Sequence, residues 1–97
     1  MRGQRSEWTE ALRQHSRRRL QFALSRFGRS VGSVTVYIIK VAGTPCGLDR
    51  GCRIVVQLMP GGRVLVEDMQ SDLYLAILQA AERAGRAVGR ALGRDSK

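Results

Sequence analysis

The sequence predicts an α+β fold in which two helices cover one face of an antiparallel three-stranded sheet. Two segments with the apolar spacing of a helix, 9–27 and 73–92, enclose three β-branched segments, 33–41, 52–59 and 63–68. The order of elements is therefore α-β-β-β-α. With 97 residues, the chain is long enough to form one modest hydrophobic core.

The first helix is expected to begin at Thr9, whose side chain suits an N-cap, and to stop at Gly28. Its packed side is predicted by one stripe of residues: Leu12, Ser16, Leu20, Ala23 and Phe27, with Leu24 beside it. Three arginines project from the other side: Arg13, Arg17 and Arg18. Arg19 and Arg26 are expected nearer the packed side.

The three strands are predicted from their β-branched and aromatic residues. A glycine-rich loop, 42–51, follows the first strand, and Pro60-Gly61-Gly62 joins the second and third strands in a hairpin. Alternation along each strand assigns its two faces. The side chains expected to face the helices are Val34, Val36, Ile38, Ile54, Val56, Leu58, Val64 and Val66.

The opposite face of the sheet carries an apolar group, although an open sheet face is usually polar. This group consists of Tyr37, Ile39, Val55 and Leu65. Partial shielding by loops or termini explains it as well as contact with a partner or a second copy of the chain. The four residues are therefore candidates for self-association.

The second helix begins after Ser71 or Asp72, either of which suits an N-cap. Its predicted packed stripe is Leu73, Ile77, Ala80, Ala84, Val88 and Ala91. Three glycines, Gly85, Gly89 and Gly93, recur every fourth residue, although each costs a helix about 1 kcal/mol relative to alanine. Either another backbone, of protein or of nucleic acid, approaches this strip closely, or the helix frays at its end.

The chain is strongly basic, and its charge is unevenly placed. Seventeen basic residues, fifteen of them arginine, oppose eight acidic ones. Residues 1–30 carry a net charge of +6 and residues 81–97 one of +3, while residues 31–80 are neutral overall. Because arginine binds phosphate and stacks on bases, this excess indicates a polyanionic partner.

The predicted contacts with that partner lie on both helices. Helical geometry clusters Arg83, Arg86, Arg90 and Arg94 within about a quarter of the circumference, beside the buried stripe. Side by side, the two helices would join these residues to Arg13, Arg17 and Arg18 in one RNA-binding surface. The alternative is a solvated arginine face supported by pairs such as Glu82–Arg86, but the uncompensated charge favours RNA.

Several other classes of protein are excluded by what the sequence lacks. No segment is apolar enough to span a membrane, and no secretory signal is present, so a cytoplasmic location is expected. Cys46 and Cys52 lack the further ligands of a zinc site; we expect a buried thiol at Cys52 and an incidental one at Cys46. One histidine and no catalytic motif predict no enzyme activity, cofactor, metal or small-molecule substrate.

Several stretches of the sequence are similar to one known family. They are TEALR at 9–13, RRLQFALSRFG at 18–28, VTVYI at 34–38, GLDRGCRIVVQL at 47–58 and, most specifically, residues 64–92 with the core DLYLAI at 72–77. Together they resemble the hibernation-promoting factor family of ribosome-associated inhibitors, once described as modulators of an alternative sigma factor. The resemblance covers residues 9–92.

The resemblance implies the family order β-α-β-β-β-α, of which this chain shows α-β-β-β-α, and it implies a function. It implies a protein that binds the 16S rRNA of the small ribosomal subunit in the channel for messenger and transfer RNA. Such binding stops initiation and preserves idle ribosomes in stationary phase or under stress. It also implies one ribosome-binding domain at 9–93, between a flexible basic N-terminus at 1–8 and a tail at 94–97. The implied contacts are Arg13, Arg17, Arg18, Arg83, Arg86 and Arg90, with Arg94 extending the row.

The sequence departs from the family pattern in three places. The family's first strand, which pairs parallel beside 33–41, has no counterpart before Gly3, so the edge of 33–41 is expected to be open for pairing with another chain. His15 and Ser16 stand at positions that are usually apolar, and we expect His15 to serve packing. The C-terminal extension through which long members dimerise ribosomes is absent, which predicts a short form.

The alternative function is that of a general double-stranded-RNA-binding domain, which has the same α-β-β-β-α order and recognises RNA by shape. That domain begins its second helix with a lysine cluster. Here the second helix begins with the acidic and apolar SDLYLAIL, residues 71–78, which favours the ribosome-binding prediction.

Overall fold

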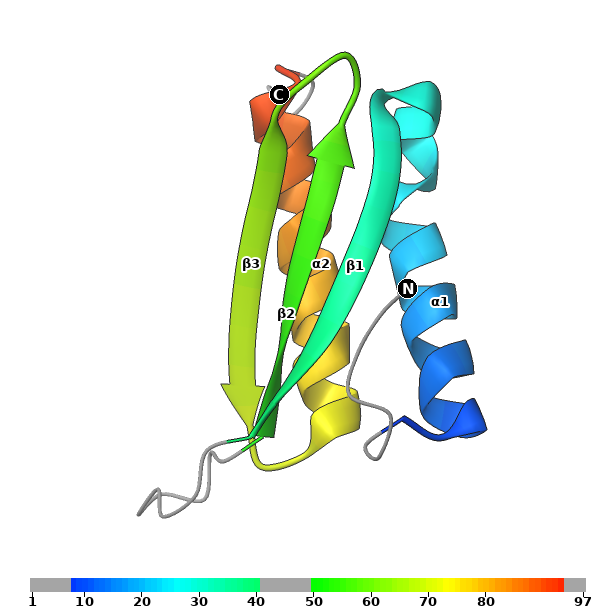
Figure 1. The fold of residues 1–97 in the computed structure, drawn as a ribbon, viewed down its shortest axis with the longest axis vertical. Helices are drawn as coiled ribbons and strands as arrows, with labels where there is room; N and C mark the ends of the chain where they lie inside the picture. Colours follow the sequence, from blue (N-terminus) through cyan, green and yellow to red (C-terminus); the bar gives the residue numbers. More distant parts are fainter. Residues whose placement is uncertain (1–7, 41–49, 94–97) are drawn as a thin grey trace.

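The structure, a computed structural model, describes residues 8–40 and 50–93 and has the predicted α+β architecture (Figure 1). The helices are α1 (Glu10–Leu24) and α2 (Leu73–Ala91), and the strands are β1 (Val31–Lys40), β2 (Arg50–Leu58) and β3 (Arg63–Gln70). A short 3₁₀ segment, η2 (Ser25–Ser30), links α1 to β1. Residues 1–7 of the predicted N-terminus, the predicted tail at 94–97 and most of the predicted loop, including Cys46, lie outside the described residues.

The sheet is antiparallel, with β2 between β1 and β3. Its register places Val36, Ile54 and Val66 in one row across the three strands. The turn between β2 and β3 is closed by the Leu58 N–H, which donates to the Gly62 carbonyl at 2.9 Å. Gly62 adopts φ +102°, a conformation that favours glycine and explains the turn predicted from Pro60-Gly61-Gly62.

Both helices lie on one side of the sheet (Figure 1), and the core fills the space between the two layers. The predicted inward residues are buried, except that Val34 and Val66 are half-buried. Trp8, which the sequence analysis assigned to the flexible N-terminus, is also buried in this core. The described core therefore includes Trp8, one residue before the predicted start of the domain.

The helix ends follow local side-chain chemistry. The Thr9 hydroxyl accepts the Leu12 N–H at 3.1 Å, and the Asp72 carboxylate, rather than Ser71, accepts the Tyr74 N–H at 3.0 Å. The α-helix ends at Leu24, earlier than predicted, and Gly28 at φ +53° turns the chain toward β1. Both N-caps satisfy backbone donors that the helix itself leaves unpaired.

The predicted stripe of α2 is correct except at its end. Ile77, Ala80, Ala84 and Val88 are completely buried, but Ala91 is exposed. Ala91 has a suitable direction around the helix, but it is the last residue of α2. Burial depends on position along the helix axis as well as around it.

Gly85 is a point of close approach between α1 and α2. A Cβ atom at Gly85 would lie 3.0 Å from the Ala23 carbonyl oxygen and 3.4 Å from the Ala23 Cβ. The backbone that approaches Gly85 is therefore that of α1. At this position the glycine serves a close helix contact and does not mark a frayed helix end. Gly93 has a different role: it adopts φ +73° and its N–H donates to the Arg90 carbonyl at 3.1 Å, as a C-terminal cap.

Cys52 is the predicted buried thiol. It lies on the inner face of β2, and its Sγ donates to the Ala76 carbonyl at 3.6 Å. Burial, with a smaller contribution from the negative charge of Asp68, raises the pKa of the Cys52 thiol to about 12. The thiol is therefore protonated at neutral pH and is a packing group.

We expect Gly85→Leu to destabilise the fold by about 2 kcal/mol, because a side chain here forces the two helix backbones apart. Leucine is a better helix former than glycine, so propensity acts in the opposite direction. Urea unfolding measures the change, and Ala91→Leu, at an exposed position of the same helix, is the matched control. Equal stability of the two variants would contradict this account of the helix contact.

The Cys52 thiol also predicts a pH dependence of stability. Because the folded-state pKa lies above the ordinary value of 9.0, the contribution to stability is complete below pH 9 and is lost as pH rises toward 12. The slope attributable to Cys52 reaches about 1.4 kcal/mol per pH unit. Unfolding free energies of the wild type and Cys52→Ala between pH 8 and about 10.5 measure it; parallel profiles would exclude this role of the thiol.

Candidate nucleic-acid interface

The predicted RNA-contacting arginines within the described residues all lie on the molecular surface. Arg94 lies outside the described residues. The exposed members are Arg13, Arg17 and Arg18 on α1 and Arg83, Arg86 and Arg90 on α2. Arg17 and Arg86 line two different hollows of this surface, and the joining of both sets of arginines in one RNA-binding surface stays a prediction.

Arginines of α1 and of the following segment η2 lie beside two different hollows. Arg17 lines a groove between α1 and β1, whereas Arg26 lines a hollow between α1 and α2. Helical geometry places Arg18 between these two directions. Arg26 was expected nearer the packed side of the first helix and was not among the predicted RNA contacts. Its position four residues after Phe22 is the sequence signal that could have placed both side chains at this hollow.

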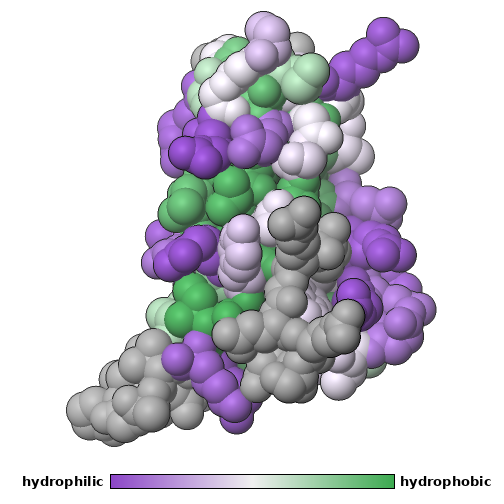
Figure 2. Space-filling model, in the orientation of Figure 1, coloured by the Kyte–Doolittle hydropathy of each residue, from purple (hydrophilic) through white to green (hydrophobic). Residues whose placement is uncertain are grey.

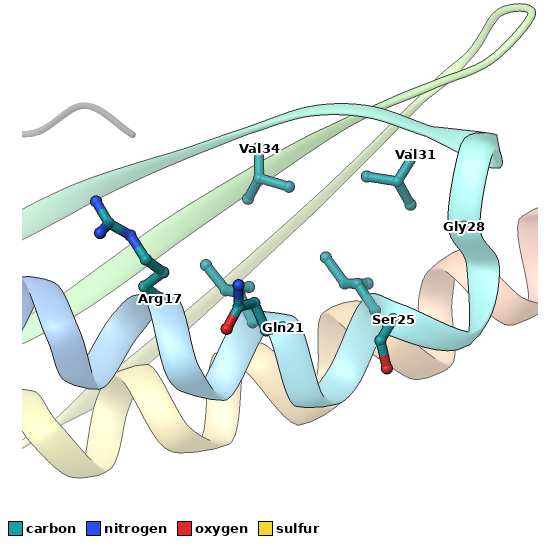
Figure 3. Close-up of a pocket in the computed structure, with 8 residues that line it drawn as sticks. Arg17, Gln21, Ser25, Gly28, Val31 and Val34 are labelled. Carbon is teal, nitrogen blue, oxygen red and sulfur yellow. The ribbon is translucent and has the colours of Figure 1, made fainter.

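The groove between α1 and β1 is apolar at its base. It has a volume of about 500 Å³ and is lined by Leu20 and Leu24 from α1 and by Val31 and Val34 from β1 (Figure 3). Within the described residues, β1 pairs only with β2, so the groove runs along the other edge of β1. Among the described residues no strand pairs along this edge, and the open edge expected from the sequence stays a prediction.

Arg83 differs from the other arginines because it is engaged by the sheet. Its guanidinium donates to the Glu67 carbonyl at 2.9 Å and to the Asp68 carboxylate at 3.1 Å. The Asp68 side chain is only 13% exposed, so this ion pair is partly shielded from water. Arg83 therefore connects α2 to β3. Because its charge is partly neutralised by Asp68, it attracts an anionic ligand less than an unpaired arginine does.

The remaining helix arginines are not neutralised. In the part of the chain that the structure describes, the ion pairs are Arg83–Asp68 and Arg53–Glu67, the latter on the sheet. The Glu82–Arg86 pair considered from the sequence is not formed, although both residues line the hollow between the helices. Unpaired arginines on the outer side of the helix layer create a positive surface suited to phosphates.

The hollow between α1 and α2 is the most distinctive part of this surface. It has a volume of about 320 Å³ and is lined by Phe22, Ala23, Arg26, Glu82, Gly85 and Arg86. Ala23 and Gly85, the small residues at the helix contact, are part of this lining. The Arg26 guanidinium lies 4.7 Å from the centre of the Phe27 ring, a cation–π contact that restrains it.

The outer face of the sheet carries the four apolar candidates for self-association, and charged side chains lie among them. Tyr37 and Leu65 are exposed, and Ile39 and Val55 are half-buried. The row Tyr37–Arg53–Glu67, with its ion pair, separates Val55 and Leu65 from Ile39. Figure 2 shows the resulting alternation of hydrophobic and hydrophilic bands across this face.

His15 and Ser16 serve packing, as expected. The His15 Nε2 donates to the Tyr74 carbonyl at 3.1 Å, and the two rings stand 4.9 Å apart at their centres. Ser16 is completely buried and its hydroxyl donates to the Leu12 carbonyl at 3.0 Å, so its polar atom is satisfied inside the helix. His15 therefore joins α1 to α2, whereas the hydrogen bond of Ser16 stays within α1.

Two further observations concern the described ranges, 8–40 and 50–93. They hold no group of three or more His, Cys, Asp or Glu side chains that could bind a metal ion. Neither of their helices is long and apolar enough to cross a membrane.

Comparison with known proteins places this arrangement in a family. Residues 1–95 match the family model described as sigma 54 modulation protein / S30EA ribosomal protein. The fold is similar to the crystal structure of the N-terminal domain of Protein Y from Thermus thermophilus, with a TM-score of 0.66 and 30% sequence identity. That match covers 91% of this chain and 90% of the Thermus chain. No curated protein sequence matches this chain.

Proposed function

Because the chain belongs to the sigma 54 modulation protein / S30EA ribosomal protein family, we propose that it is a ribosome hibernation factor that inhibits translation. Its partner is the small ribosomal subunit, and its site is the 16S rRNA of the channel for messenger and transfer RNA. It acts in the cytoplasm during stationary phase or stress. The observation that carries the proposal is the set of unpaired arginines on the two helices.

The charges of the two helices support an RNA partner. Arg17, Arg18, Arg26, Arg86 and Arg90 face solvent, and none forms an ion pair with a described acidic residue. Each phosphate contact made by such a residue releases counterions, so affinity falls steeply with salt. The many weak contacts of a broad surface suit folded rRNA better than a small ligand.

A general double-stranded-RNA-binding domain remains the alternative. The start of α2 offers Asp72, Leu73 and Tyr74, without a basic side chain, and the arginines of α2 lie in its second half. A domain that reads duplex shape needs basic groups that meet the phosphates across a groove. Binding to a duplex RNA therefore distinguishes the two functions.

We expect the protein to co-sediment with purified small subunits and to bind a control RNA duplex weakly. Arg86→Glu combined with Arg90→Glu should lower subunit affinity about a hundredfold and reduce the dependence on salt, because phosphate contacts are replaced by repulsion. Arg63→Glu reverses an exposed charge on the sheet, in no ion pair with a described residue, and is the control. Wild-type affinity in the helix variant would contradict the proposal, and equal binding of both RNAs would favour the alternative.

We also propose that two copies associate through the open edge of β1. This ten-residue strand has no proline, and its one charged residue is Lys40 at its end, so little guards the edge. Analytical ultracentrifugation over a range of concentrations should show a dimer that Ser33→Lys, an added edge charge, dissociates. A wild-type monomer at every concentration would exclude this association.

A further inference from the structure

Phe22 is the most exposed large apolar side chain in the described part of the protein, at 83% exposure. It lies on α1 and forms one wall of the hollow between α1 and α2. Phe27, five residues later, is buried and is covered by Arg26. The exposure of Phe22 therefore contrasts with that of its nearest aromatic neighbour in the sequence.

The surroundings of Phe22 are basic. On the helix surface, residues three and four positions away are neighbours, which places Arg18, Arg19 and Arg26 around it. Arg86 lines the same hollow from α2. An exposed apolar side chain among unpaired arginines suits a ligand that combines a flat apolar face with negative charge, as a nucleotide does.

The base of the nucleotide fits the hollow better than its phosphate does. Glu82 lines the hollow, and its carboxylate disfavours a phosphate there. The same carboxylate can accept a hydrogen bond from the amino group of a base. The volume of about 320 Å³ lies at the lower end of small-molecule sites, which span about 300–1,000 Å³.

We propose that Phe22 is a stacking platform for one unpaired base of RNA. The ring of Phe22 contacts the face of the base, and Arg18, Arg26 and Arg86 bind the phosphates on either side of it. This inference rests on the proposed function, because the base belongs to the bound rRNA. It adds that the protein binds a single-stranded nucleotide, whereas contacts with phosphates alone do not distinguish paired from unpaired RNA.

The test compares the affinities of four Phe22 variants for purified small subunits over a salt series. We expect Phe22→Ala and Phe22→Leu to weaken binding about tenfold, within the range measured for loss of a base–aromatic stack. Phe22→Tyr and Phe22→Trp should retain wild-type affinity. Because no charge is removed, the salt dependence should not change in any of the four. Leu75→Ala, which truncates an exposed apolar residue in the first turn of α2, is the matched control.

A fluorescence measurement distinguishes a base from an apolar protein surface. In Phe22→Trp, stacking on a base should quench the new indole emission when subunits are added, relative to the wild type, whose Trp8 is buried. Full affinity of Phe22→Leu, or a blue shift without quenching, would mean that a protein surface covers Phe22 and would overturn the inference.

The same series separates the inference from the function on which it rests. Unchanged affinity of Phe22→Ala, together with weak binding of the Arg86 and Arg90 variant, would overturn the stacking platform and leave the proposed function standing. Unchanged affinity of the arginine variant would instead overturn the proposed function, and the inference with it.

Discussion

The contact between Gly85 and Ala23 is the constraint on which the arrangement of this protein depends. α2 packs on β2 and β3, and α1 packs mainly against α2, so the position of the first helix is set through the second. The absence of a side chain at Gly85 lets the two backbones meet at van der Waals distance. The same contact brings Arg26 and Arg86 to one hollow. The packing of the two helices therefore also sets the positions of these two surface charges.

Much of the fold was predictable because the residue pattern within each helix and strand identifies that element. The order of the elements follows from the change between periods of 3.6 and 2 residues, and the inward faces of the strands follow from alternation, as the burial of Val36 and Ile54 confirms. The exposure of Ala91 and the burial of Trp8 were not predictable in this way. Both depend on where the packed layers begin and end.

The candidate site was predictable in composition but not in layout. Arg83 and Arg86 are indistinguishable in the sequence, yet Arg83 lies beside Asp68 of β3 while Arg86 lies at the helix contact. Arg26 and Phe22 were missed because the period of one helix does not say which flank its neighbour will approach. That direction is decided by the small residues Ala23 and Gly85, which act between segments far apart in the chain.

The charged row between apolar residues on the outer sheet face affects whether two copies can stack sheet against sheet. Stacking of two such faces, as in the packed sheets of a fibril, requires dry interdigitating surfaces. Here any second sheet would have to strip water from Arg53 and Glu67 in the middle of the contact, at a cost that the flanking Val55 and Leu65 offset only in part. The ion pair between Arg53 and Glu67 thus opposes the stacking of a second sheet on this face.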